Sequence, residues 1–136
     1  TRQVMRRVER SGMAKGAIRE LCLVLSDDAG IRVVNRRHLK ADRPTDVISF
    51  RYLPLPGTRQ CRADVIVNVQ RALECGTRSA RWNPSMELAL YIAHGCDHLT
   101  GADDRSAADR ARMRRRELRW LQDPVVRSNA ARLLPS

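Results

Sequence analysis

Short runs of apolar and β-branched residues predict strands at three places in the chain. These runs cover residues 19–25 (RELCLVL), 46–50 (DVISF) and 63–69 (ADVIVNV). The last is the clearest, because it is short, apolar and rich in β-branched side chains. Residues 51–62, between the second and third runs, contain two prolines and a glycine, which predicts a loop.

Apolar residues at helical spacing predict helices around these strands. The predicted helices cover residues 3–15, the stretch after Asp28, and residues 70–80, 85–100 and 106–121. Asp27 and Asp28 suit the start of the second helix, because short polar side chains accept the free backbone N–H groups there. The tail after Pro124 is expected to add a short helix or to fray. Strands interleaved with helices over 136 residues predict one α/β or α+β domain.

The chain has a large excess of basic residues, which indicates the kind of partner it binds. There are 26 Lys and Arg against 15 Asp and Glu, a formal net charge of +11, and only Lys15 and Lys40 are lysines. Arginine binds phosphate through a planar fork, so a polyanionic partner such as RNA is indicated. A genome that favours arginine codons would give the same composition. No apolar run is long enough to span a membrane and no signal-peptide pattern is present, so we expect a cytoplasmic protein.

The helix predicted at residues 85–100 carries the strongest candidate for a functional site. His94 and His98 stand four residues apart, on one helix face, and can direct ring nitrogens at a single point. A catalytic zinc takes three protein ligands. Gly101 can adopt the left-handed conformation that turns the chain back, which would place Asp104 as the third ligand.

Two histidines at this spacing are a weak signal alone, because ordinary helix histidines give the same pattern. The added glycine and acid, in the form H-x3-H-x2-G-x2-D, favour a metal site. Zinc peptidases with H-E-x-x-H use the glutamate as general base, whereas this chain has Gly95 at that place. Peptide hydrolysis by that route is therefore not expected.

Several blocks of residues match the motifs of one family. The stretch from His94 to Asp104 resembles H-G-x-L-H-L-x-G-x-D-H. Asn35 with residues 42–50 (DRPTDVISF) resembles N…D-x-P-T-D-V-L-S-F, and residues 63–67 (ADVIV) resemble G-D-I-x-I. Further motif positions are occupied by Met113 and Glu117, which stand where M-x-x-x-E is expected. From about Leu21 to Leu121 the chain thus resembles the YbeY family of bacterial metal-dependent endoribonucleases.

This resemblance implies a single α+β domain over residues 1–136, with a mixed sheet of about four strands and a central metal-binding helix. It implies one Zn²⁺ per chain, held by His94, His98 and Asp104, and cleavage of single-stranded RNA. It also implies a role on the small ribosomal subunit, in 16S rRNA 3′-end maturation and ribosome quality control.

The chain departs from the family pattern at two positions that bear on activity. Asp104 replaces the usual histidine, and a carboxylate is an acceptable but harder ligand, so another divalent metal is possible. The family's arginine, within Y-R-G, is missing, because Leu39 occupies its place. Arg37, Lys40 or Arg43 would have to substitute for it if RNA cleavage is retained.

A third departure is Asp97, which replaces an apolar residue on the buried side of the helix. An unpaired carboxylate there would be costly. We favour an ion pair with an arginine of the helix at residues 106–121. The alternative is that Asp97 orients the ring of His94 or His98.

No general base is evident, and the candidates are Asp46, Asp103 and a water molecule on the metal. The RNA-binding candidates are Arg36, Arg37 and Arg43, which could form a basic wall.

The run Arg114-Arg115-Arg116 must point in several directions on a helix. We expect most of these arginines to be solvated or paired with Asp109 and Glu117.

The sequence gives no indication of the oligomeric state. It is also compatible with two other functions. A non-catalytic, ribosome-associated protein stabilised by its metal predicts tight metal and rRNA binding without cleavage. A metal-dependent hydrolase of another substrate predicts activity on small esters or peptides and little affinity for RNA.

Overall fold

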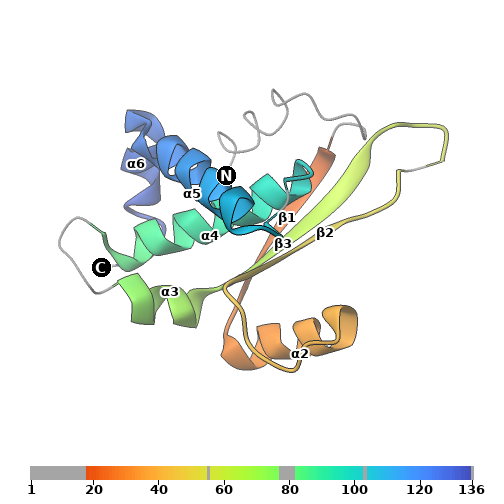
Figure 1. The fold of residues 1–136 in the computed structure, drawn as a ribbon, viewed down its shortest axis with the longest axis horizontal. Coiled ribbons are helices and arrows are strands. Elements are labelled where there is room, and N and C mark those ends of the chain that lie inside the picture. The colour runs from red at the N-terminus through yellow and green to blue at the C-terminus, as the bar shows by residue number, and fades with distance from the viewer. Residues whose placement is uncertain (1–17, 55, 77–81, 103, 136) are drawn as a thin grey trace.

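The α+β architecture expected from the sequence is confirmed by the computed structural model, which describes residues 18–54, 56–76, 82–102 and 104–135. The helix expected at residues 3–15 lies outside these ranges. In chain order the elements are β1 (Ile18–Ser26), α2 (Asp28–Leu39), β2 (Val47–Arg51), β3 (Cys61–Asn68), α3 (Val69–Cys75), α4 (Pro84–Leu99), α5 (Ala107–Gln122) and α6 (Pro124–Ala130) (Figure 1).

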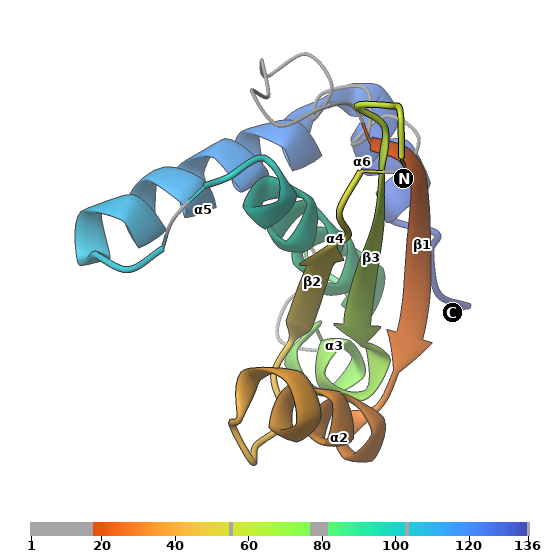
Figure 2. The ribbon, with the colours of Figure 1, turned by 90° about the vertical axis from the view of Figure 1, so that its right-hand side faces the viewer.

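The described strands form one mixed sheet in the order β1-β3-β2. β1 runs parallel to β3, with Leu23 opposite Val65, and β2 runs antiparallel to β3, with Ser49 opposite Val65. The three predicted strands are confirmed, with ends shifted by one or two residues. The expected sheet of about four strands is a three-stranded sheet within the described residues. Figure 2 shows the strands side by side, with α2 below the ends of β1 and β3.

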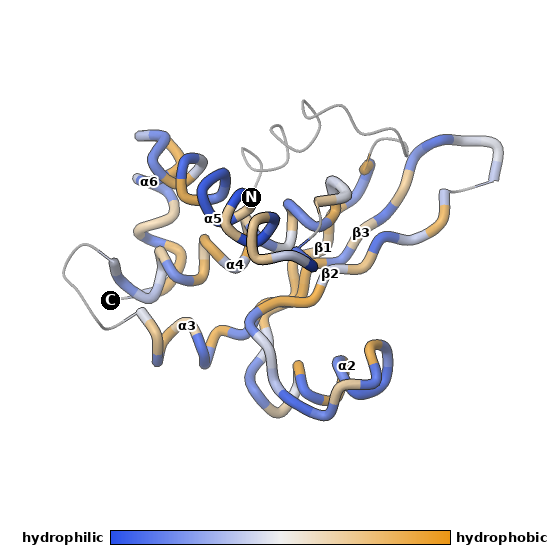
Figure 3. Tube along the Cα trace, in the orientation of Figure 1, coloured by the Kyte–Doolittle hydropathy of each residue, from blue (hydrophilic) through white to orange (hydrophobic). Residues whose placement is uncertain are grey.

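The α4 helix is the centre of the core, because it packs against β2, β3, α3, α5 and α6. Its buried side chains include Leu88, Ile92 and Cys96, which join Val65 and Val67 of β3 in one apolar cluster. In Figure 3 hydrophobic colours gather where the strands run side by side and along parts of α4, whereas α5 is largely hydrophilic. Among the described helices, none combines the length and the apolarity that a bilayer crossing requires.

Local capping explains where α4 begins and ends. The Asn83 side chain accepts a hydrogen bond from the Met86 N–H at 2.9 Å, and Pro84 occupies the first helical turn. After Thr100 the chain leaves the helix through Gly101, whose φ of +86° lies in the left-handed region. The predicted turn at Gly101 is therefore confirmed, and it brings the following segment back toward α4.

Gly95 lets α4 lie unusually close to the sheet. A Cβ atom at this position would be 2.8 Å from Val47 Cγ2 and from Val65 Cγ1, and 2.9 Å from Ser49 Oγ. The Ser49 hydroxyl also donates a hydrogen bond to the Gly95 carbonyl at 2.8 Å. Position 95 thus faces the sheet and has no space for a side chain, which explains why the glutamate of H-E-x-x-H is absent.

Replacing Gly95 with alanine is expected to destabilise the fold by about 1–3 kcal/mol, because the added methyl group overpacks the helix–sheet contact. An unhindered Gly→Ala change inside a helix would instead stabilise by up to about 1 kcal/mol. Urea denaturation measures the change in unfolding free energy, and the sign of that change distinguishes an overpacked position from an unhindered one. A more stable G95A variant would contradict the close contact.

Candidate metal centre and its cavity

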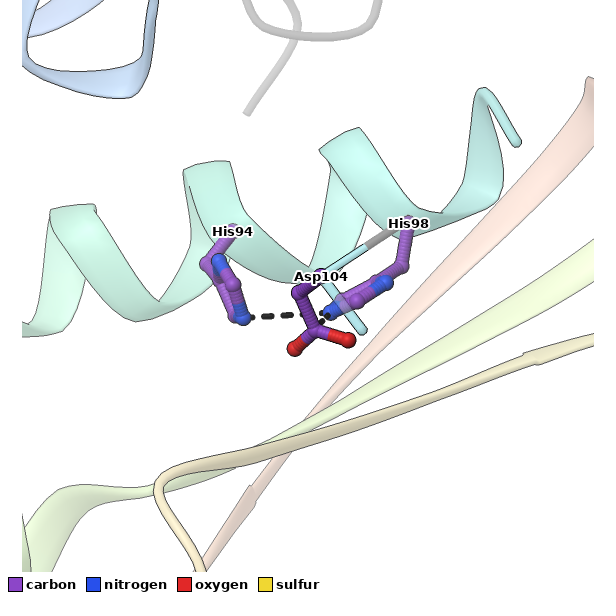
Figure 4. Close-up of side chains that lie close together, drawn as sticks. All are labelled: His94, His98 and Asp104. Carbon is purple, nitrogen blue, oxygen red and sulfur yellow. Dashed lines mark hydrogen bonds and ion pairs between the residues drawn. The ribbon is translucent and has the colours of Figure 1, made fainter. Parts of the chain in front are cut away.

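Three side chains meet beside the C-terminal half of α4. His94 and His98 lie one turn apart, and their Nε2 atoms are 3.1 Å apart. Asp104 comes from the segment after Gly101, and its Oδ2 is 3.6 Å from His98 Nε2. One possible ligand atom from each residue lies within 4.8 Å of the others, and Figure 4 shows the three side chains converging. We call His94, His98 and Asp104 the ligand cluster.

The ligand cluster fits a small divalent cation. Two nitrogen ligands at about 2.0–2.1 Å from a tetrahedral ion lie about 3.3 Å apart, which is close to the 3.1 Å between the two Nε2 atoms. Two imidazoles and one carboxylate also form a ligand set used at catalytic zinc sites. The three residues are only partly buried, so a further coordination position can face solvent. The cluster could therefore bind a metal through three protein ligands.

Glu117 of α5 orients the first histidine. Its Oε1 lies 2.7 Å from His94 Nδ1, and its side chain is 2% exposed. A carboxylate accepts the hydrogen bond, so the proton resides on Nδ1 and the Nε2 lone pair faces the ligand cluster. Burial lowers the pKa of His94, but the hydrogen bond and charge of Glu117, helped by Asp46 and Asp104, outweigh it and raise the pKa above its usual value.

Asp97 is held by an ion pair with α5. Its carboxylate, 1% exposed, accepts hydrogen bonds from Nε and Nη2 of Arg116 at 2.7–3.2 Å. The ion pair favoured from the sequence is confirmed. The alternative, that Asp97 orients a ligand histidine, is wrong for His94, because Glu117 holds that ring. The sequence did contain a signal for the role of Glu117. This acid lies at helical spacing from Met113 and Trp120, which are both buried, so it occupies the apolar stripe of α5.

A cavity of about 260 Å³ opens beside the ligand cluster. One wall comes from α4, the facing wall from α5, and the rest from the residue before β2 and the segment before α5. It is lined by Asp46, Leu90, Tyr91, His94, Asp104, Arg110, Arg114 and Glu117. Groups of both charges thus face one space next to the candidate metal ligands.

Asp46 is the candidate base that the structure brings to this cavity. Its Oδ1 accepts hydrogen bonds from the Val47 N–H at 2.9 Å and from the Thr45 hydroxyl at 3.1 Å. Its negative charge is also one of the influences that raise the pKa of His94. The other candidate, Asp103, lies outside the described residues.

The arginines expected to contact RNA lie away from this cavity. Arg36 and Arg37 are exposed in the last turn of α2, Arg43 is exposed in the following loop, and none of them lines the cavity. Leu39, which we expected to occupy the place of the family arginine, is 57% exposed. The cationic side chains that line the cavity come from α5 instead, and they are Arg110 and Arg114. Arg110 was not among the residues considered from the sequence.

Comparison with known proteins relates this chain to one family. The family model described as Endoribonuclease YbeY matches residues 1–124. A protein of that name from Rhodopirellula baltica is 39% identical over 95 residues, which is 69% of this chain and 48% of that protein. One from Fusobacterium nucleatum is 35% identical over 103 residues, 71% of this chain and 62% of that protein. The chain therefore spans about half the length of the curated relatives it matches.

Removing Glu117 should weaken metal binding although the three ligand residues themselves are unchanged. Without the Glu117 carboxylate the His94 ring loses its orientation, and the Zn²⁺ affinity of E117A is expected to fall about 10–100-fold. Competition with a fluorescent zinc chelator measures this affinity. The control is E20A, which removes an exposed carboxylate on β1. Equal Zn²⁺ affinities in folded E117A and E20A would contradict the orienting role.

Removing Arg116 should destabilise the fold, because it leaves the Asp97 carboxylate buried without its partner. R116A is expected to lose about 3 kcal/mol of unfolding free energy in urea denaturation. The neighbouring R115A removes the same charge from an exposed position and should stay within about 0.5 kcal/mol of the wild type. Equal stabilities of the two variants would refute the importance of the ion pair.

Proposed function

Since the chain belongs to the YbeY endoribonuclease family, we propose that it is a zinc-dependent endoribonuclease that cleaves single-stranded RNA. The observation that carries this proposal is the ligand cluster at a cavity that also holds two arginines and Asp46. A metal, a candidate base and phosphate-binding cations are the parts that hydrolysis of a phosphodiester requires.

We propose zinc as the cation because two imidazoles and one carboxylate form a typical zinc ligand set. Asp104 is a harder ligand than histidine, which keeps other divalent metals in competition. When bound, such a cation polarises a phosphate oxygen and favours ionisation of a nearby water molecule.

The protein's own groups have separate roles in this proposal. Glu117 keeps a proton on His94 Nδ1 and so keeps Nε2 directed at the ligand cluster. Asp46 lies on the cavity wall and is the proposed proton acceptor during attack on the phosphodiester. The net charge of +11 concentrates RNA near the surface, where Arg36, Arg37 and Arg43 remain proposed contacts for the strand outside the cavity.

The biological setting is proposed from the family resemblance together with the positive charge. The substrate would be 16S rRNA near its 3′ end on the small ribosomal subunit, in the cytoplasm. The same activity would serve ribosome quality control.

Metal content and RNA cleavage test this proposal together. Protein purified without added metal or a metal-binding tag should carry about one zinc per chain by elemental mass spectrometry, and should cleave a labelled single-stranded RNA. H94A and H98A should lose both the metal and the cleavage. H38A is the matched control, because His38 is exposed on α2 and packs on Phe50, away from the ligand cluster.

Each alternative function gives a different result in these assays. Full metal occupancy in H94A or H98A would refute the assignment of these histidines as metal ligands. Metal and rRNA binding without cleavage would favour the non-catalytic, ribosome-associated protein. Cleavage of small esters or peptides, with little RNA affinity, would favour a hydrolase of another substrate.

A further inference from the structure

We propose that Arg114 binds a phosphate group of the RNA beside the ligand cluster, replacing the family arginine that this chain lacks. The identity of the ligand rests on the proposed function. The anion site itself rests on the cavity, on the partners of its charged residues and on its net charge.

The first observation is the position of Arg114 on α5. Arg110, Arg114 and Glu117 recur at i, i+4 and i+7, so they share one face of the helix, and all three line the cavity. Glu117 reaches His94 from this face. The same face that orients a metal ligand therefore also presents two guanidinium groups to the space in front of it.

The second observation is that the other charged groups from this face already have partners. Arg110 Nη1 donates to the carbonyl of Asp104 at 3.0 Å and to that of Arg105 at 3.2 Å, so Arg110 holds the segment that carries the third ligand. Glu117 is bound to His94. Arg114 forms no hydrogen bond or ion pair with another residue in the described parts of the chain. The arginines at 114–116 were expected to be solvated or paired with Asp109 and Glu117. Solvation is confirmed for Arg114 and Arg115, which are exposed. The pairing is wrong, because those two acids contact Arg112 and His94.

The third observation is the charge balance of the cavity. Three carboxylates, those of Asp46, Asp104 and Glu117, face the two guanidinium groups of Arg110 and Arg114. A divalent cation at the ligand cluster leaves one net positive charge in this space. That charge matches a single phosphodiester. Both guanidinium groups contribute to it, but Arg110 already donates hydrogen bonds to backbone carbonyls, so Arg114 is the better placed of the two to bind the phosphate directly.

Arginine suits this role chemically. Its planar guanidinium offers two parallel N–H groups to two phosphate oxygens, and it keeps its charge at every physiological pH. The α2 arginines cannot fill the role from where they lie, since none of them lines the cavity. The chain thus supplies its phosphate-binding cation from α5, on the wall facing α4, rather than from the end of α2.

Two measurements on R114Q, R114K and R115Q test the proposal. The first is cleavage of a labelled single-stranded RNA by the metal-loaded protein. The second is the affinity of the same protein for a short 2′-O-methyl oligoribonucleotide, with inorganic phosphate as competitor. Arg115 is the matched control, because it carries the same charge on the next residue, is exposed, and does not line the cavity.

We expect R114Q to lose roughly tenfold or more in both measurements relative to R115Q, the effect of removing one hydrogen-bonded charge. R114K should recover part of the loss. Circular dichroism and zinc content should match the wild type in all three variants, because Arg114 is exposed and forms no hydrogen bond or ion pair with a ligand residue among the described residues.

The outcomes separate this inference from the proposed function. Cleavage by the wild type with equal losses in R114Q and R115Q would overturn the role of Arg114 and leave the ribonuclease proposal standing. Selective loss of oligonucleotide and phosphate binding in R114Q, without cleavage by the wild type, would support the anion site and refute the ribonuclease proposal. No binding of either probe by the wild type, with no cleavage, would overturn both.

Discussion

Two buried carboxylates hold the structure together where α5 crosses α4, and the candidate site depends on that crossing. Asp97 of α4 is bound by Arg116 of α5, and Glu117 of α5 is bound by His94 of α4. A buried carboxylate without a partner is costly, so each contact penalises any other relative position of the two helices. Arg116 and Glu117 are adjacent on α5, whereas their partners on α4 are three residues apart. Together the two contacts define the position of α5 along α4 and its rotation about its own axis.

This crossing gives α5 three roles at one cavity. Glu117 orients the first ligand, Arg110 holds the segment that carries the third, and Arg114 presents the cation that we assign to phosphate. In such an arrangement the ligand cluster and the anion site cannot move independently, because one rigid helix carries both supports. A catalytic site benefits from this coupling, since its charged groups are positioned before the substrate binds.

The close contact at Gly95 distinguishes the candidate metal site from that of the H-E-x-x-H peptidases. The residue after the first histidine faces β2 and β3 so closely that a side chain there would have to displace Val47, Val65 and Ser49. This position also points at the sheet, so it does not offer a base to the cavity as the glutamate of H-E-x-x-H peptidases does. We propose that the base comes from another element that lines the cavity, and Asp46, just before β2, is the candidate carboxylate that the described structure places there.

Sequence by itself determined the features that depend on near neighbours along the chain. The three strands, the N-cap at Asp27, the turn at Gly101 and the convergence of His94, His98 and Asp104 follow from periodicity, capping and spacing over a few residues. Tertiary structure alone decided which groups meet across α4 and α5. Whether Asp97 pairs with an arginine or orients a histidine, and whether the exposed Arg114 lines the cavity, depends on the rotation of one helix against another. Spacing along the chain does not specify that rotation, because the packing of many distant side chains sets it.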